Sequence, residues 1–105
     1  MLFHLTMTHT EDNCPGYNRE MMPNLLEAGE RLPTVAKDLG VTVHSLVWGA
    51  PEHVAFALLE AESIGAITQY VNSIPIRQDT RVNVVEPLAD VLETGRAMLA
   101  RMQEK

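Results

Sequence analysis

The amino-acid sequence predicts an α+β fold in a single domain, on three observations. Near the N-terminus, apolar and polar residues alternate with the period of a β-strand. From about residue 19 to residue 39, the apolar residues instead follow helical spacing. The 105 residues are enough for one modest hydrophobic core, and no apolar run approaches the roughly 20 residues that span a membrane.

The first half of the chain predicts a strand, a polar loop and a long helix. The loop at residues 10–17 carries the turn signal Pro15-Gly16. Because Pro33 removes a backbone donor inside the helix, we expect either a kink or two helical pieces, with Pro33 opening the second. Gly40 is then the expected end of the helix.

The second half predicts a hairpin, a helix, a strand and a final helix. The turn Gly49-Ala50-Pro51-Glu52 separates the two hairpin strands. Ser63 is the expected N-cap of the helix that follows, and Pro87 ends the last strand. The expected elements, in order, are strand 2–9, helix 19–39, strand 41–48, strand 53–59, helix 63–72, strand 81–86 and helix 88–102.

Without the last helix, this order is βαββαβ, the pattern of a ferredoxin-like fold with both helices on one face of an antiparallel sheet. Right-handed crossovers set the strand order at 4-1-3-2, with the strands numbered along the chain. The other face of the sheet would be semi-apolar, and soluble monomers rarely expose such a patch. We therefore expect a homodimer or higher homo-oligomer that covers it. The alternative is a monomer whose C-terminal helix folds over its own sheet.

Composition and charge limit the classes of partner and the cellular location that we expect. The net charge is −6 and the basic residues are scattered, so nucleic acid and anionic membranes are not expected partners. One cysteine allows no internal disulfide, and the N-terminus has no signal-like segment, which together favour a cytoplasmic protein. The sequence contains no Gly-rich phosphate loop, GxSxG or HExxH motif.

Several segments resemble the dimeric α+β barrel superfamily, over roughly residues 1–88. The opening Met1-Leu2-Phe3-His4-Leu5-Thr6-Met7 is similar to the start of muconolactone isomerase-like proteins, and residues 53–63, 74–76 and 84–88 follow the superfamily's pattern. The resemblance implies a dimeric α+β barrel that binds its ligand between helices and sheet or inside the barrel. It also implies isomerase or cofactor-independent monooxygenase chemistry as the enzymatic options.

The first candidate site lies inside the expected barrel. Strand alternation places His4 and His44 on one face, about 10 Å apart across two strand spacings, and histidine is the usual proton-transfer residue near neutral pH. We prefer the register that puts small alanines between them, which leaves room for a planar small molecule. The expected ligand-binding residues are Thr6, Thr8, Leu46, Trp48, Ala55 and Ala57, with Tyr17 as a lid or as a residue that packs on the helix.

The second candidate site lies at one end of the sheet. Topology brings His9, Cys14 and His53 to the same end, and a thiolate with two imidazoles suits zinc, copper or nickel. The alternatives are unrelated polar loop residues or a nucleophilic or redox thiol at Cys14. The leading interpretation is thus a small-molecule-binding barrel using proton transfer by His4 or His44. A non-enzymatic metal-binding protein and an interaction domain without a site remain as alternatives.

Overall fold

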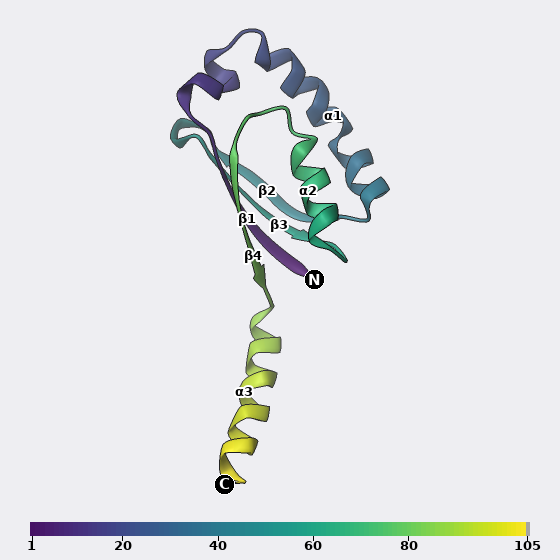
Figure 1. Ribbon diagram of the computed structural model, residues 1–105, viewed down its shortest axis with the longest axis vertical. Helices are drawn as coiled ribbons and strands as arrows, with labels where there is room; N and C mark the ends of the chain where they lie inside the picture. Colours follow the sequence, from purple (N-terminus) through teal and green to yellow (C-terminus); the bar gives the residue numbers. More distant parts are fainter. Residues whose placement is uncertain (105) are drawn as a thin grey trace.

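The computed structural model describes residues 1–104 and has the predicted α+β architecture. Four strands, β1 (Leu2–Thr8), β2 (Thr42–Gly49), β3 (Val54–Glu60) and β4 (Asp79–Val85), form one antiparallel sheet. The observed order β2-β3-β1-β4 is the predicted order 4-1-3-2 read from the other edge. Helices α1 (Met21–Leu39) and α2 (Ile64–Asn72) lie together on one side of this sheet (Figure 1).

The core lies between the sheet and these two helices. Phe3, Leu5 and Met7 of β1 are buried, as their alternation predicts, and Leu59 of β3 is fully buried beside them. Helix α2 contributes Ile67 to the same cluster. The Ser63 side chain accepts a hydrogen bond from the Ala66 amide at 3.2 Å, so the predicted N-cap is confirmed.

Helix α1 is one continuous element, and the expectation of two pieces is wrong. Pro33 lies inside the helix on its exposed side, and the residue four positions earlier is Gly29, also exposed. Water can therefore solvate the Gly29 carbonyl that loses its helical donor, which reduces the cost of the proline. Gly40 ends the helix in the left-handed conformation at φ 70°, as predicted.

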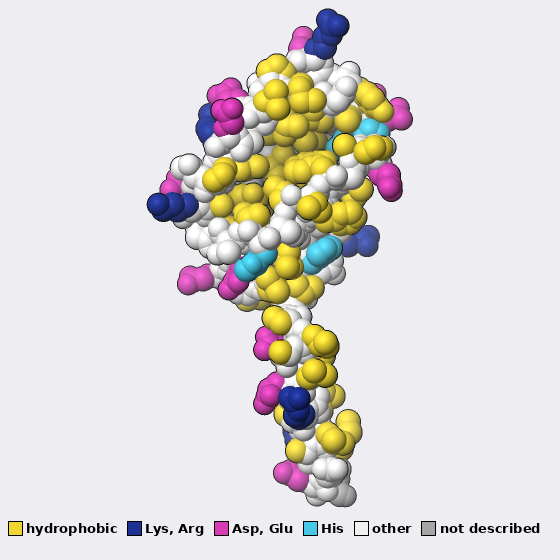
Figure 2. Space-filling view, turned by 180° about the vertical axis from the view of Figure 1, so that it is seen from behind, with side chains coloured by type: hydrophobic (Ala, Val, Ile, Leu, Met, Phe, Trp, Pro, Cys, Tyr) yellow, Lys and Arg dark blue, Asp and Glu magenta, His cyan; other side chains and the backbone are white. Residues whose placement is uncertain are grey.

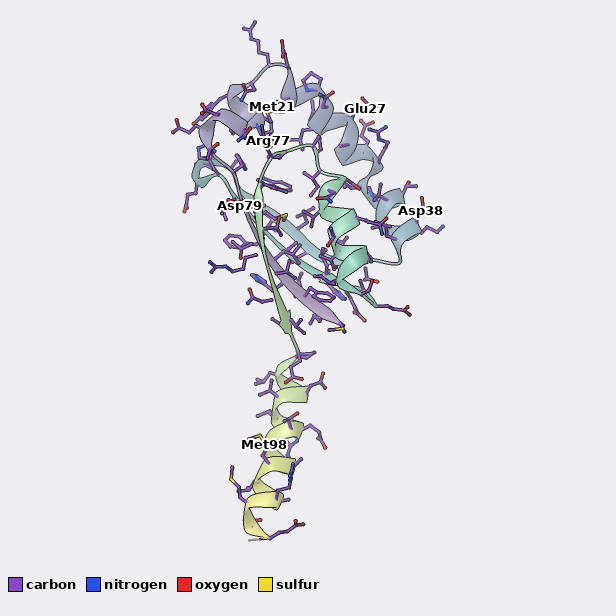
Figure 3. The ribbon with its side chains drawn as sticks, viewed as in Figure 1. Met21, Glu27, Asp38, Arg77, Asp79 and Met98 are labelled. Carbon is purple, nitrogen blue, oxygen red and sulfur yellow. The ribbon has the colours of Figure 1, made fainter. Side chains whose placement is uncertain are left out.

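The C-terminal helix α3 (Leu88–Gln103) projects away from the body of the molecule (Figure 1). None of its residues is buried, and the labelled Met98 lies well clear of the sheet (Figure 3). The alternative in which this helix folds over its own sheet is therefore wrong. The molecule measures 64 × 30 × 18 Å, and its radius of gyration of 17.6 Å exceeds the roughly 13 Å of a compact 100-residue domain.

Hydrophobic side chains gather over part of the body and continue along α3 (Figure 2). On α3 the exposed apolar residues recur with helical spacing and form one stripe: Leu88, Val91, Leu92, Met98, Leu99 and Met102. Within residues 1–104, no helix combines the length and the apolar character needed to cross a membrane.

Candidate metal centre

His9, Cys14 and His53 come together at one end of the sheet. Their candidate ligand atoms all lie within 4.8 Å of one another, and each residue is half-buried. The three residues come from three segments: His9 follows β1, Cys14 lies in the loop before α1, and His53 precedes β3. A hydrogen bond of 3.2 Å from the His9 amide to the His53 carbonyl joins two of these segments directly.

The loop that carries Cys14 is held by its own hydrogen bonds. It consists of two short 3₁₀ turns, Glu11–Asn13 and Pro15–Tyr17, with Cys14 between them. The Asn18 side-chain amide donates to the Asp12 carbonyl at 3.1 Å and to the Cys14 carbonyl at 2.9 Å. Pro15 is buried, which anchors the loop against the body. The thiol is therefore presented from a fixed turn.

His53 adopts an unusual backbone conformation. Its φ of 57° and ψ of 39° lie in the left-handed region, and within residues 1–104 it is the one non-glycine residue with positive φ. It closes the β2–β3 hairpin after the turn Ala50–Glu52, a position that usually favours glycine or asparagine. A histidine held there directs its imidazole toward His9, and backbone strain of this kind clusters at functional sites.

The electrostatics of the cluster favour a neutral imidazole at His9. The His9 and His53 rings meet edge to face with centroids 5.2 Å apart. Burial, and then the neighbouring His53, lower the pKa of His9 below its usual 6.5. Within residues 1–104, His9 Nε2 and His53 Nδ1 are buried without hydrogen-bond partners. Buried ring nitrogens without partners are costly, and a metal ion is one way to satisfy them.

A groove of about 1000 Å³, the apolar groove, opens beside the three side chains. Helix α1 forms one wall, the β2–β3 hairpin the second, and the α2–β4 connection the third. Tyr17 stands next to the cluster, with its ring centroid 5.6 Å from that of His53. The groove residues beyond the cluster are Pro15, Gly16, Tyr17, Met22, Leu25, Leu26, Ala28, Gly29, Glu30, Leu32, Trp48, Ala50, Pro51, Ile74, Pro75 and Ile76.

The preferred register of the other candidate site is wrong. Ala55 and Ala57 are opposite the buried Met7 and Leu5, so they lie on the helix side and are 1% and 2% exposed. Phe56 and Leu58 take their place on the open face, the sheet face that α1 and α2 leave uncovered. The space expected for a planar ligand between the histidines is therefore filled by larger side chains.

A bulge in β2 explains the remaining misplacement. The pairing with β3 shifts between Val43 and Ser45, so alternation does not continue through this point. Beyond the bulge, Leu46 and Trp48 lie on the helix side, opposite Ala57 and Ala55. The prediction that they line the open face is therefore wrong, and Trp48 instead lines the apolar groove next to the His-Cys-His cluster.

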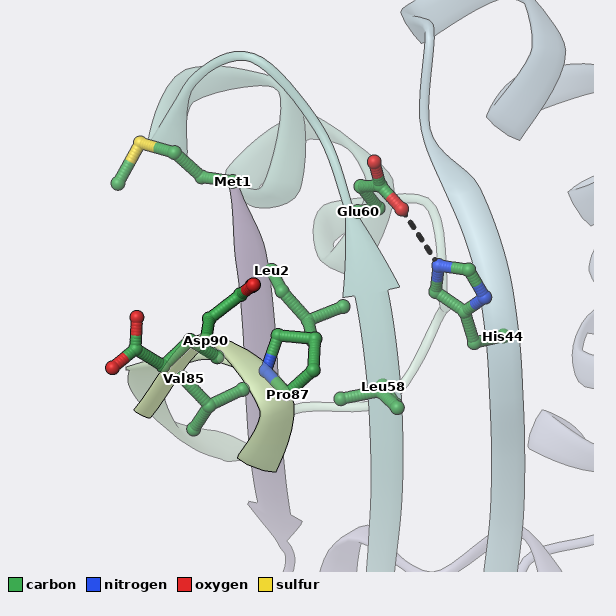
Figure 4. Close-up of a pocket in the computed structure, with 9 residues that line it drawn as sticks. Met1, Leu2, His44, Leu58, Glu60, Val85, Pro87 and Asp90 are labelled. Atoms are coloured by element: carbon green, nitrogen blue, oxygen red, sulfur yellow. Dashed lines mark hydrogen bonds and ion pairs between the residues drawn. The ribbon is translucent and has the colours of Figure 1, made fainter. Parts of the chain in front are cut away.

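His4, His44, Thr6 and Thr8 do belong to the open face. His4 lies opposite Leu58, and its ring centroid is 6.3 Å from that of Phe56. The His44 side chain reaches Glu60, and its Nε2 lies 2.8 Å from Glu60 Oε1 (Figure 4). The side chains of His44 and Glu60 line a shallow groove of about 530 Å³ at the base of α3. The same groove is also lined by Met1, Leu2, Leu58 and Pro87. No sequence pattern pointed to Glu60 as the partner of His44.

Comparison with known proteins supports the fold alone. No protein-family model matches the chain, and no curated protein does. Among solved structures, the de novo designed protein Ferredog-Diesel is 14% identical with a TM-score of 0.50, over 80% of this chain and 85% of that chain. A dimeric ferredoxin-like protein from an uncultured marine organism is 18% identical with a TM-score of 0.34, over 82% and 95% of the two chains. Neither of these two structures is a muconolactone isomerase. The likeness to the designed protein shows a ferredoxin-like fold.

Proposed function

We propose that this protein binds one transition-metal ion per chain through His9, Cys14 and His53. The observation that carries the proposal is the convergence of their ligand atoms to within 4.8 Å, from three separate segments. Ligands on a tetrahedral zinc ion stand about 3.3 to 3.6 Å apart, from the usual Zn–N and Zn–S lengths. Side-chain rotations would have to close the difference of about 1 Å, and an ion held by His9 Nε2 and His53 Nδ1 would give these two unpartnered nitrogens a partner.

The donor set restricts the metal. One thiolate and two imidazoles suit zinc, copper and nickel, whereas magnesium and calcium prefer oxygen ligands. Three protein ligands leave a fourth position for water or another molecule, which is the arrangement of catalytic rather than structural zinc sites. The lowered pKa of His9 also favours metal binding, because only a neutral imidazole binds a metal.

Metal loading of the full chain tests the proposal. The chain is treated with a chelator, incubated separately with Zn²⁺, Cu²⁺, Ni²⁺ and Co²⁺, desalted, and analysed for metal content. We expect one ion per chain in the wild type, close to none in Cys14→Ala, and a thiolate charge-transfer band with Co²⁺. His44→Gln is the matched control, because it removes a histidine outside the cluster and should keep full loading. Equal, substoichiometric loading of wild type and Cys14→Ala would reject a metal site.

A second candidate function is proton transfer by His44 on the open face. Its support is the contact of 2.8 Å with Glu60, since a carboxylate that accepts the Nε2 proton leaves Nδ1 free as a base. The groove at the base of α3, beside His44 and Glu60, suits a small, largely apolar substrate, as in isomerase or cofactor-independent monooxygenase chemistry. Turnover of small enol-lactones or quinols that disappears in both His44→Gln and Glu60→Gln supports this function. Equal rates in wild type and variants reject it.

A homodimer is the assembly that fits the exposed surfaces. On the open face, Val47 is 56% exposed and Phe56 is 40% exposed, while α3 carries its apolar stripe beyond the body. A second copy would cover both surfaces, and the extended shape of the chain gives each α3 the reach to contact another molecule. Light scattering should give twice the chain mass for wild type and for the control Ile64→Glu, an exposed residue on α2. Phe56→Glu with Leu99→Glu should give a monomer, and an unchanged mass would reject this interface.

A further inference from the structure

The apolar groove beside the His-Cys-His cluster has the composition of a binding site for one class of molecule. Its lining includes exposed apolar side chains on two sides: Leu26 of α1 is 63% exposed, and Trp48 of β2 is 38% exposed. Each would lose contact with water when an apolar molecule enters, at a gain of about 25 cal/mol for every Å² covered. The groove therefore offers apolar binding energy that the chain itself does not use.

Charge restricts where the polar part of such a molecule can lie. Among the groove residues the one formally charged side chain is Glu30, and neither lysine nor arginine is present. A phosphate, or a carboxylate bound far from the cluster, would thus meet no counter-charge and one repelling carboxylate. A metal ion on His9, Cys14 and His53 would supply positive charge at the end of the groove that these three residues line.

We infer that the groove and the open coordination position act together, and bind an apolar molecule that carries a single metal-coordinating head group. This inference rests on the proposed metal site. The head group, such as an azole nitrogen, a thiolate or a phenolate, takes the fourth position on the metal. The body lies along the groove against Leu26 and Trp48. Phosphorylated metabolites and sugars, which are polar throughout, are excluded by the same surface.

Two probes with the same donor and different bodies test the inference. The full chain is loaded with Co²⁺, and the visible spectrum of the ion is followed during titration with imidazole and with 4-phenylimidazole. We expect both probes to change the spectrum, and 4-phenylimidazole to bind at least ten-fold tighter than imidazole. In Leu26→Gln, the preference should fall below about three-fold, while cobalt loading and the affinity for imidazole stay unchanged. Ile64→Gln, an exposed residue of α2 outside the groove, should keep the full preference.

The outcomes separate the two proposals. If Co²⁺ does not bind, or binds without a thiolate charge-transfer band, the metal site is overturned and the inference falls with it. Cobalt binding with equal affinities for the two probes, or with no response to either, leaves the metal site in place and overturns the inference. A ten-fold preference that persists in Leu26→Gln and in Trp48→Ala also overturns it, because the phenyl ring then binds outside the groove.

Discussion

Replacement of His53 by glycine separates the backbone role of this residue from its role in the cluster. At φ 57° and ψ 39°, an L-residue costs roughly 1 to 2 kcal/mol, which glycine does not incur. Glycine in turn loses about 0.5 to 1 kcal/mol more conformational entropy on folding. The backbone bonds from His53 to Ala50 and from His9 to His53 do not use the side chain and persist. We therefore expect the metal-free variant to remain within about 1 kcal/mol of wild type.

The stabilisation of the protein by zinc should change far more in His53→Gly than the stability of the metal-free protein does. A ligand at 1,000 times its Kd stabilises a folded protein by about 4 kcal/mol, and a shift of 1 kcal/mol moves Tm by roughly 4 to 8 °C in a domain of this size. Calorimetry with and without Zn²⁺ should thus show a large rise of Tm in wild type and none in His53→Gly. His53→Asn, which tolerates the left-handed conformation but has no imidazole, should behave like the glycine variant.

Two results would refute this reasoning. A loss of more than about 2 kcal/mol in metal-free His53→Gly would mean that the imidazole is needed for packing, for example against the Tyr17 ring. A zinc response that survives in both variants would mean that the metal binds without His53. In either case, the strained backbone at the hairpin would not serve the metal site.

Three further predictions concern stability and protonation. Leu59→Ala, at a side chain that is 0% exposed, should lower the free energy of unfolding by about 2 to 5 kcal/mol in urea titrations. Gly40→Ala should cost about 1 kcal/mol in the same assay, because φ is 70° and no atom beyond the two neighbouring residues lies within 4 Å of the added Cβ, so the cost is conformational. Burial and His53 lower the pKa of His9, so in the metal-free protein its NMR titration midpoint should lie below 6.5 and rise in His53→Gln. The unfolded chain then binds this proton first, and stability should decrease as the pH falls from 6.5 through the folded-state pKa.

The sheet and its order could be predicted because their causes are local. Alternation over residues 2–8 buries Phe3, Leu5 and Met7 as expected, and the handedness of the crossovers leaves one arrangement of the four strands. The convergence of His9, Cys14 and His53 follows from the same topology, since the first strand ends where the third begins. The distance between their ligand atoms could not be predicted, because it depends on two 3₁₀ turns and on the left-handed backbone of His53.

The positions of Leu46 and Trp48 were not predictable, because one bulge in β2 decides them. Strand periodicity assumes unbroken alternation, and β2 breaks it between Val43 and Ser45. The bulge leaves His44 with Glu60 on the open face and moves Trp48 to the helix side, into the apolar groove. A tryptophan expected beside His44 thus lines the apolar groove, which the His-Cys-His cluster also lines. The apolar groove is more hydrophobic than the groove beside His44, and the residues that can hold a metal line it. This arrangement favours the metal site over the open-face histidines as the functional centre.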